Sequence, residues 1–268
     1  MAETATRQRA LITGASAGIG EGFAQHLAKR GYDLVLIARR RDRLEQAASG
    51  LSAQHGIEAS VLEADLTKDE GLALVEERLR RGDIDLLVNN AGFGTFGEFA
   101  KLPLARELEE LDLNVRALMR LSHAGLGPMI ERKSGGVINV ASAAAFQPVP
   151  FNATYSATKA FVLHFSEALH EEVRQYGVHV VALCPGPVKT EFQEVAGLDQ
   201  SVIPAFAWET VDTVVESALS ALRSGRAMSV PGSFNKMTAG TVRVTPRFLV
   251  RRIAGSMFRD RGRGPSAN

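Results

Sequence analysis

The chain has 268 residues, of which 45% are hydrophobic and 23% charged, so it is long enough to bury a core of its own. Its 31 basic residues nearly balance its 30 acidic ones, which leaves no overall field to attract nucleic acid. The single cysteine, Cys184, excludes an internal disulfide. The first ten residues lack the apolar stretch of a signal peptide, and no apolar run reaches the roughly 20 residues of a membrane span. We therefore expect a soluble cytoplasmic protein.

Short apolar segments alternate with longer amphipathic ones along the chain. We predict strands at 10–13, 34–38, 59–63, 86–89, 137–140, 178–184 and 227–230, with helices between them such as 19–30 and 41–54. This rhythm predicts an α/β fold in which a parallel sheet carries helices on both faces. The expected fold class is a single-domain, Rossmann-like, doubly wound sheet of about seven strands, with the ligand at the carboxyl ends of the strands.

We divide the chain into two regions. Residues 1–242 form the expected dinucleotide-binding and catalytic domain, with a lid at about 190–210 that closes over the substrate. Residues 243–268 form a basic amphipathic extension.

A glycine-rich turn follows the first predicted strand. Thr13 leads into Gly14, Ser16, Gly18, Ile19 and Gly20, and a helix begins there. Glycine lets backbone amides approach a pyrophosphate closely, and the helix N-terminus offers unpaired N–H groups. A glycine-rich turn can also be only a turn, but its place between a first strand and a first helix favours dinucleotide binding.

The end of the second predicted strand indicates which dinucleotide binds. An acid there would accept bonds from the ribose hydroxyls of NAD, but the chain has Arg39, Arg40 and Arg41. Guanidinium groups pair with a 2′-phosphate. The alternative is a solvated basic turn, although basic residues are unfavourable near a helix start. We predict NADP(H) as the cofactor, with Arg39 as the main determinant.

A tyrosine and a lysine share one helix face in the second half of the chain. Tyr155 and Lys159 are four residues apart, so the phenol and the ammonium lie side by side. A neighbouring ammonium, with the positive nicotinamide of the oxidised cofactor, lowers the pKa of a phenol and allows proton exchange near neutral pH. Such a pair by itself is usually structural. Ser142 ends the preceding strand, where its hydroxyl can meet the same carbonyl oxygen, and Asn114 lies in the helical stretch 111–121.

These motifs, together with Asn89-Asn90-Ala91-Gly92 and Pro185-Gly186, resemble the short-chain dehydrogenases/reductases in order and spacing. The resemblance covers residues 9 to about 190. It implies a catalytic tetrad of Asn114, Ser142, Tyr155 and Lys159. In that family Tyr protonates the substrate oxygen, Ser orients it, Lys binds the nicotinamide ribose and lowers the Tyr pKa, and Asn holds a water that links Lys to solvent.

The resemblance also implies the cofactor contacts. Asp65 matches an adenine contact, Asn90 supports the central sheet, and Thr190 lies at the carboxamide side. The full predicted set is Gly14, Ser16, Gly18, Ile19, Gly20, Arg39, Arg40, Asp65, Leu66, Asn90, Tyr155, Lys159, Pro185, Gly186, Val188 and Thr190. Ala17 stands where some NADPH-using relatives carry a second basic residue, which leaves coenzyme choice to Arg39 and Arg40. We expect no metal site.

Apolar residues surround the expected substrate region. They are Phe192, Val195, Leu198, Ile203, Phe206 and Trp208 in the lid, and Phe93, Phe96 and Phe146 elsewhere. An apolar lining favours a 3-oxoacyl, steroid-like or aromatic ketone over a sugar. The alternative is that the lid packs these groups against the body whatever the ligand.

The C-terminal extension contains seven arginines and one acid, Asp260, between residue 243 and the end. Apolar residues interleave with them, so the segment could lie on an anionic membrane surface or dock on a partner subunit. The alternative is a tail packed on the body with a solvated basic face.

The predicted activity is NADPH-dependent, reversible hydride transfer between nicotinamide and a carbonyl or secondary alcohol (class EC 1.1.1). The family's helix pairing between subunits, around Asn114 and 153–176, implies a homodimer or homotetramer. A non-catalytic NADPH-binding regulator of the same fold is the alternative, and an incomplete tetrad would support it. A longer nucleotide-sugar epimerase does not fit the chain length, and a methyltransferase has no use for the Tyr155–Lys159 pair.

Overall fold

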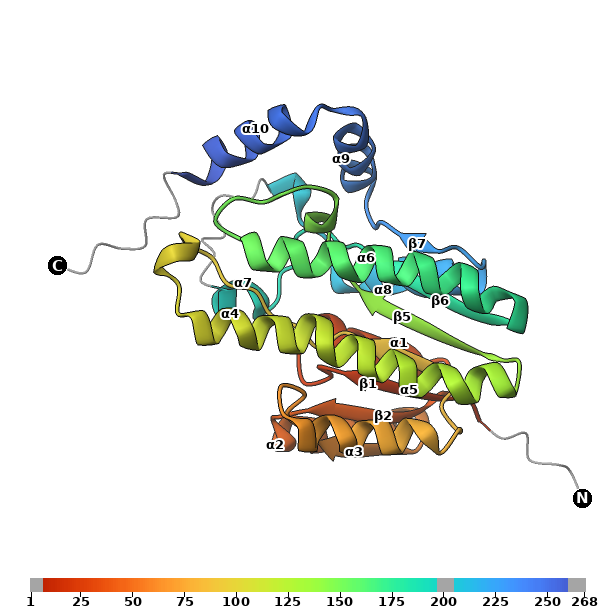
Figure 1. Ribbon diagram of the computed structural model, residues 1–268. Coiled ribbons are helices and arrows are strands. Elements are labelled where there is room, and N and C mark those ends of the chain that lie inside the picture. Colours follow the sequence, from red (N-terminus) through yellow and green to blue (C-terminus); the bar gives the residue numbers. More distant parts are fainter. Residues whose placement is uncertain (1–6, 197–204, 260–268) are drawn as a thin grey trace, which may run out of the picture.

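The computed structural model describes residues 7–196 and 205–259, which form a layered α/β structure (Figure 1). Seven parallel strands form one sheet in the order β3-β2-β1-β4-β5-β6-β7. They are β1 (Arg9–Thr13), β2 (Asp33–Ala38), β3 (Ala59–Glu63), β4 (Leu86–Asn89), β5 (Gly135–Val140), β6 (Val178–Leu183) and β7 (Met228–Ser229). The reversal of strand order between β1 and β4 is that of a doubly wound fold, so the predicted fold class is confirmed.

Helices cover both faces of the sheet. One face packs against α1 (Gly18–Ala28), α2 (Arg41–His55) and α8 (Val211–Arg223). The other packs against α3 (Asp69–Arg80), α5 (Leu118–Glu131) and the end of α6 (Ala153–Val173). The remaining helices are α4 (Leu104–Leu111), α7 (Phe192–Ala196), α9 (Ser233–Val244) and α10 (Arg247–Arg259). None of the helices in the described ranges is long and apolar enough to span a bilayer.

The strands form because their side chains are apolar on both faces. Ile12 and Leu34 belong to the core on the α1 side, whereas Leu11 and Val35 belong to the core on the α3 side. Successive strand residues point to opposite faces, so a continuous apolar run fills both cores at once. This is why the buried strands were recognisable in the sequence. The domain boundary that we expect after residue 242 lies within α9.

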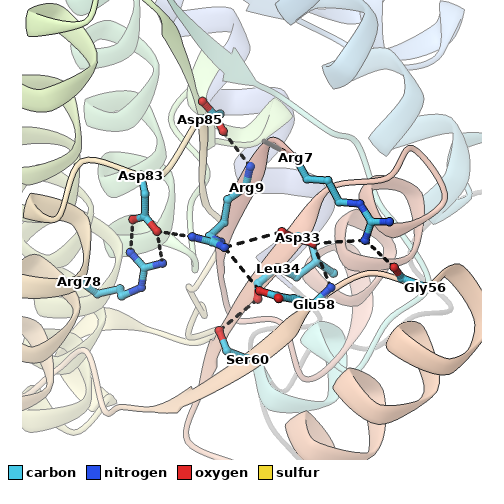
Figure 2. Close-up of polar contacts among 10 residues, drawn as sticks. All are labelled: Arg7, Arg9, Asp33, Leu34, Gly56, Glu58, Ser60, Arg78, Asp83 and Asp85. Atoms are coloured by element: carbon cyan, nitrogen blue, oxygen red, sulfur yellow. Dashed lines mark hydrogen bonds and ion pairs between the residues drawn. The ribbon is translucent and has the colours of Figure 1, made fainter. Parts of the chain in front are cut away.

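Charged residues join the amino ends of three strands, at the edge of the sheet opposite to the carboxyl ends of the strands (Figure 2). The Arg9 guanidinium lies 3.6 Å from Asp33 and 3.7 Å from Glu58. It also pairs with Asp83, which accepts a 2.9 Å bond from Arg78. Positive and negative groups are matched here, so the cluster ties β1, β2 and β3 together.

Arg9→Met should lower the free energy of unfolding by about 1 kcal/mol, because it removes several partly exposed ion pairs. The loss should shrink at high salt, which screens the pairs in the wild type. Turnover should not change, because the cluster lies far from the carboxyl ends of the strands, where the ligand is expected. Urea denaturation at low and high salt measures the effect. Arg81→Met is the control, since Arg81 makes a single exposed ion pair within the described residues, with Glu77. An equal loss of unfolding free energy in both variants would contradict a stabilising role for the ion pairs of Arg9.

Candidate active site

A cleft of about 690 Å³ lies at the carboxyl ends of the strands. Almost the whole predicted residue set lines it. The lining includes Gly14, Ser16, Gly18, Ile19, Arg39, Arg40, Asp65, Leu66, Asn90, Ser142, Tyr155, Lys159, Pro185, Gly186, Val188 and Thr190. Gly20 and Asn114 are the exceptions, and both lie directly behind lining residues. The cleft therefore brings the glycine turn and the Tyr–Lys pair to one site.

The glycine turn has the shape of a phosphate cradle. Gly14 and Gly18 have φ values of 67° and 58°, a region that other residues rarely adopt. A Cβ at Gly20 would lie 2.3 Å from the Gly14 carbonyl oxygen. Any side chain at these positions would strain the turn or push it open. The start of α1 therefore faces the cleft with bare backbone, which fits a pyrophosphate.

The loop after β4 is fastened to the glycine turn. Thr13 Oγ1 accepts hydrogen bonds from the backbone N–H groups of Asn90 and Ala91, at 2.9 and 3.0 Å. The Asn90 amide donates back to the Thr13 carbonyl at 3.0 Å. Thr13 was not singled out in the sequence, because a threonine at a strand end carries no distinctive signal. It fixes the distance between the two cofactor-facing loops.

Asn114 holds the far side of the same loop. Its Oδ1 accepts from Phe93 N at 3.1 Å, and its Nδ2 donates to Phe93 O at 2.8 Å and to Thr158 Oγ1 at 3.1 Å. Asn114 lies in a π-helical segment, Asp112–Ala117, between α4 and α5; such segments often mark functional sites. Both amide hydrogens are used, so the side chain can bind the expected water only through its remaining oxygen lone pair.

Two glycines in this loop leave room for the catalytic side chains. A Cβ at Gly92 would lie 2.9 Å from Asn114 Oδ1 and 3.4 Å from Lys159 Nζ. A Cβ at Gly94 would lie 2.9 Å from the Tyr155 ring. The loop backbone thus runs within contact distance of three tetrad residues. A family motif located Gly92, but Gly94 gave no signal of its own.

The remaining tetrad residues meet at the centre of the cleft. Ser142 follows β5 and starts a short 3-10 turn, where its Oγ accepts from Ala144 N at 3.1 Å. Tyr155 and Lys159 come from the first turns of α6. Lys159 Nζ lies 5.6 Å from the centre of the Tyr155 ring and donates to Val140 O at 2.8 Å. Hydroxyl, phenol and ammonium therefore face one space.

Burial dominates the ionisation of this pair in the cofactor-free protein. Burial raises the pKa of Tyr155 to about 12, although a hydrogen bond to Ser142 lowers it. Burial lowers the pKa of Lys159 to about 8, although the nearby Glu110 carboxyl has the opposite effect and raises it. The expected depression of the Tyr155 pKa by Lys159 is therefore absent before the cofactor binds. The positive nicotinamide of the oxidised cofactor is the remaining source of that depression.

Two buried acids stand behind the catalytic pair. Glu107 and Glu110 point inward from α4, whereas Leu104 and Leu108 on the same helix are exposed. Thr95 Oγ1 donates to Glu110 at 3.0 Å, and Thr154 donates to Glu107. One oxygen of each acid has no hydrogen-bond partner within the described residues. The residue pattern of α4 does not indicate these buried acids, because acids in a polar helix are expected to face solvent.

The coenzyme end of the cleft is cationic. Arg40 donates to Ser16 Oγ at 3.0 Å and to Glu191 at 2.7 Å. Glu191 also accepts from Arg43 at 2.6 Å, so the start of the lid is tied to α2. Arg39 lines the cleft without a hydrogen bond or ion pair to any part of the chain that the structure describes. Its guanidinium is available to a 2′-phosphate.

Asp65 has a defined orientation at the same end. Its Oδ1 accepts from Thr67 N at 3.0 Å and from Thr67 Oγ1 at 2.7 Å. Burial raises the pKa of Asp65, but the Thr67 bonds and the nearby Arg39 outweigh burial and hold it below its usual value. The carboxylate is thus ionised and positioned where an adenine amino group is expected.

The substrate end is partly apolar. Phe93, Phe146 and Phe192 line the cleft, as expected, together with Val149 and Val242. The Phe192 ring lies 5.3 Å from the Tyr155 ring. Two other aromatic residues that we expected at the cleft, Phe96 and Trp208, are not among its lining residues. The Phe96 ring lies near that of Phe151, and the Trp208 ring lies near Lys189. The expected lid residues Leu198 and Ile203 lie outside the described residues. No cluster of three or more potential metal-binding side chains is found in the described ranges.

Glu110→Gln should flatten the pH dependence of stability. Burial raises the pKa of Glu110 from 4.5 to about 7, so the folded protein holds this proton more tightly than the unfolded chain. The resulting stability is complete below pH 4.5 and is lost as pH rises through about 7. The loss should be on the order of 3 kcal/mol in the wild type.

Urea denaturation at a series of pH values between 4.5 and 8 measures this loss. The matched control is Glu77→Gln, since the Glu77 side chain is exposed on α3. Parallel profiles for wild type and Glu110→Gln would show that another group titrates.

Comparison with known proteins agrees with this geometry. The family model described as "short chain dehydrogenase" matches residues 8–201. The very-long-chain 3-oxoacyl-CoA reductase of Anas platyrhynchos is 34% identical over 218 residues, covering 78% of this chain and 67% of that protein.

Two solved structures are similar over nearly their whole length. A short-chain dehydrogenase from Sphingobium yanoikuyae in complex with NADPH has a TM-score of 0.81 and 34% identity, covering 90% of this chain and 97% of its own. The bulky-bulky ketone specific alcohol dehydrogenase of Comamonas testosteroni has a TM-score of 0.77 and 30% identity, covering 91% and 96%. The range 8–201 spans all four predicted tetrad positions. The chain belongs to the short-chain dehydrogenase family.

Proposed function

We propose that the protein is an NADPH-dependent oxidoreductase that reduces a carbonyl, or oxidises the matching secondary alcohol, in an apolar substrate. The observation that carries this proposal is the shared cleft, in which Tyr155, Ser142 and Lys159 face the same space as the glycine turn and Arg39. Oxidoreductase chemistry on CH–OH or keto groups follows from the family.

The residues of the cleft fit the cofactor. The bare backbone at Gly14, Gly18 and Gly20 admits a pyrophosphate, and Asp65 is positioned for adenine. NADPH bound there supplies the hydride that reaches the carbonyl carbon. The NADPH complex of the Sphingobium yanoikuyae relative supports this choice of cofactor.

The chain's own residues supply the proton and the orientation. Tyr155 donates its phenolic proton to the carbonyl oxygen, which becomes the alcohol hydroxyl, and it takes a proton back in the reverse direction. Ser142 donates a hydrogen bond to the same oxygen and holds it near Tyr155. Lys159, whose pKa burial lowers to about 8, exchanges protons near neutral pH and can return one to the phenolate.

The substrate class follows from the lining and the relatives. Phe93, Phe146, Phe192 and Val242 suit a ring or a chain better than a sugar. One relative acts on 3-oxoacyl-CoA and another on bulky ketones, by their names. We propose a 3-oxoacyl, steroid-like or aromatic ketone. The non-catalytic alternative is not favoured, because all four tetrad residues are present and grouped.

Tyr155→Phe removes only the hydroxyl, so folding and NADPH binding should persist. Turnover should fall by about 10²- to 10⁴-fold, the usual contribution of general acid catalysis. A panel of bulky ketones, followed by loss of NADPH absorbance, identifies a substrate and measures this effect. Tyr176→Phe is the control, since Tyr176 is exposed after α6. Near wild-type turnover in Tyr155→Phe would exclude the proposed proton donor.

The arginines after β2 lead to a prediction about coenzyme preference. A 2′-phosphate near Arg39 and Arg40 gains charge-assisted hydrogen bonds, so NADPH should bind at least about tenfold more tightly than NADH. Arg39→Asp should erase or reverse that order, because an acid accepts ribose hydroxyls and repels phosphate. Fluorescence titration with both reduced coenzymes measures the two affinities. Arg41→Ala is the matched control, since Arg41 bonds to Glu45 on its own helix. Equal affinities in the wild type would contradict phosphate recognition by these arginines.

We also propose that the protein is a symmetric dimer or tetramer. Leu104, Leu108 and Leu111 on α4, Met119 on α5 and Phe161 on α6 are all exposed. A second copy covering them would remove apolar surface from water. Light scattering at micromolar concentration should give a multiple of 28.8 kDa, and Leu108→Glu should reduce the mass. A wild-type monomer would contradict this assembly.

A cytoplasmic location remains our proposal. The single buried Cys184, which cannot form an internal disulfide, supports a reducing compartment.

A further inference from the structure

The last two helices border the substrate end of the cleft. Asn235, Thr238 and Val242 form one face of α9 and line the cleft. A Cβ at Gly255 of α10 would lie 3.7 Å from Pro150, so α10 packs beside the segment that leads to Tyr155. Figure 1 shows both helices, in blue, outside the layers that cover the sheet.

Large apolar side chains point outward from these helices. Val250 and Ala254 form the buried side of α10. On its other side Phe248 is 52% exposed, Leu249 41% and Ile253 60%, and Met237 of α9 is 63% exposed. One exposed apolar residue needs no explanation, but several on two consecutive helices mark an interaction surface.

The charged residues of this part of the sequence have one sign. Residues 217–259 contain eight basic residues and no acid. Arg247, Arg251 and Arg252 are exposed, and none makes an ion pair with any residue in the described ranges. Many arginines elsewhere are paired with acids, as Arg116 and Arg120 are with Asp69. Three exposed arginines without an acidic partner in the described ranges therefore lie together on α10.

We propose that the outer face of α9 and α10 binds the surface of an anionic lipid bilayer. This docking face consists of Met237, Phe248, Leu249 and Ile253, with Arg247, Arg251 and Arg252. The apolar side chains enter the boundary between headgroups and acyl chains, and the guanidiniums pair with lipid phosphates and carboxylates. The helices lie on the surface and do not cross it.

The composition favours a bilayer over other partners. A symmetric contact between two copies of α10 would bring together two helices with the same excess of positive charge, and residues 217–259 contain no acid to neutralise it. Nucleic acid would use the arginines, but Leu249, Ile253 and Met237 have no counterpart on a phosphodiester backbone. A bilayer of anionic lipid satisfies both the apolar and the positive groups.

Sedimentation of the full chain with vesicles tests the proposal directly. The protein should bind vesicles of phosphatidylcholine containing about one-third phosphatidylserine, and bind much less to phosphatidylcholine alone. Salt should weaken the binding. Replacing both arginines, Arg251→Gln with Arg252→Gln, should weaken it at least about tenfold, and Ile253→Glu should do the same by burying a charge at the interface.

Matched controls come from surfaces far from α10. Leu74→Glu and Arg174→Gln alter similarly exposed residues on α3 and after α6, and both should bind vesicles like the wild type. Unchanged thermal melting of the variants shows that they fold. No turnover is measured, so failure here leaves the proposed reaction untouched.

Three outcomes would overturn the docking face. The first is wild-type protein that binds neither kind of vesicle. The second is vesicle binding that Ile253→Glu and the arginine variant leave intact. The third is a different partner in the absence of vesicle binding. A change of mass in light scattering for Ile253→Glu would assign the face to a second copy, and oligonucleotide binding would assign it to nucleic acid.

Discussion

The site depends on the backbone of one loop, the segment after β4, being held in place from both sides. Thr13 fastens its start to the glycine turn, and Asn114 fastens its middle to the helix behind it. Because the loop backbone runs so close to the catalytic side chains, only glycine fits at Gly92 and Gly94. The same hydrogen bonds therefore set the width of the cofactor cradle and the position of the catalytic side chains.

Desolvation is the second constraint. A phenol and an ammonium enclosed together resist charging, so burial raises the pKa of Tyr155 and lowers that of Lys159. The inward-facing Glu110 adds a third group whose neutral form is favoured. At neutral pH the Tyr155 phenol is therefore neutral, whereas Lys159, whose pKa burial lowers only to about 8, still mostly carries its proton. In the alcohol-oxidising direction Tyr155 must ionise before it can accept a proton, and the positive charge of the oxidised cofactor favours that ionisation. This couples the chemistry to cofactor binding.

Sequence patterns predicted the sheet because its strands bury apolar residues on both faces, as Leu11 and Ile12 do. They also predicted the cleft lining, since the glycine turn and the Tyr155–Lys159 pair have characteristic spacings. They did not predict Glu110 or the Thr13 contacts, because those roles depend on which residues the fold brings together. The Glu191 bridge to Arg40 joins segments 151 residues apart, a distance that no local pattern spans.

The most direct test of the central role of Tyr155 is a spectroscopic titration of its phenol. The chain has three tyrosines, so the difference between wild type and Tyr155→Phe isolates this one by tyrosinate absorbance. Without cofactor, Tyr155 should stay protonated up to a pH near 12. With the oxidised cofactor bound, it should ionise below the ordinary tyrosine value of 10.0. A Tyr155 pKa that stays near 12 with the cofactor bound would contradict its assignment as the proton donor and acceptor.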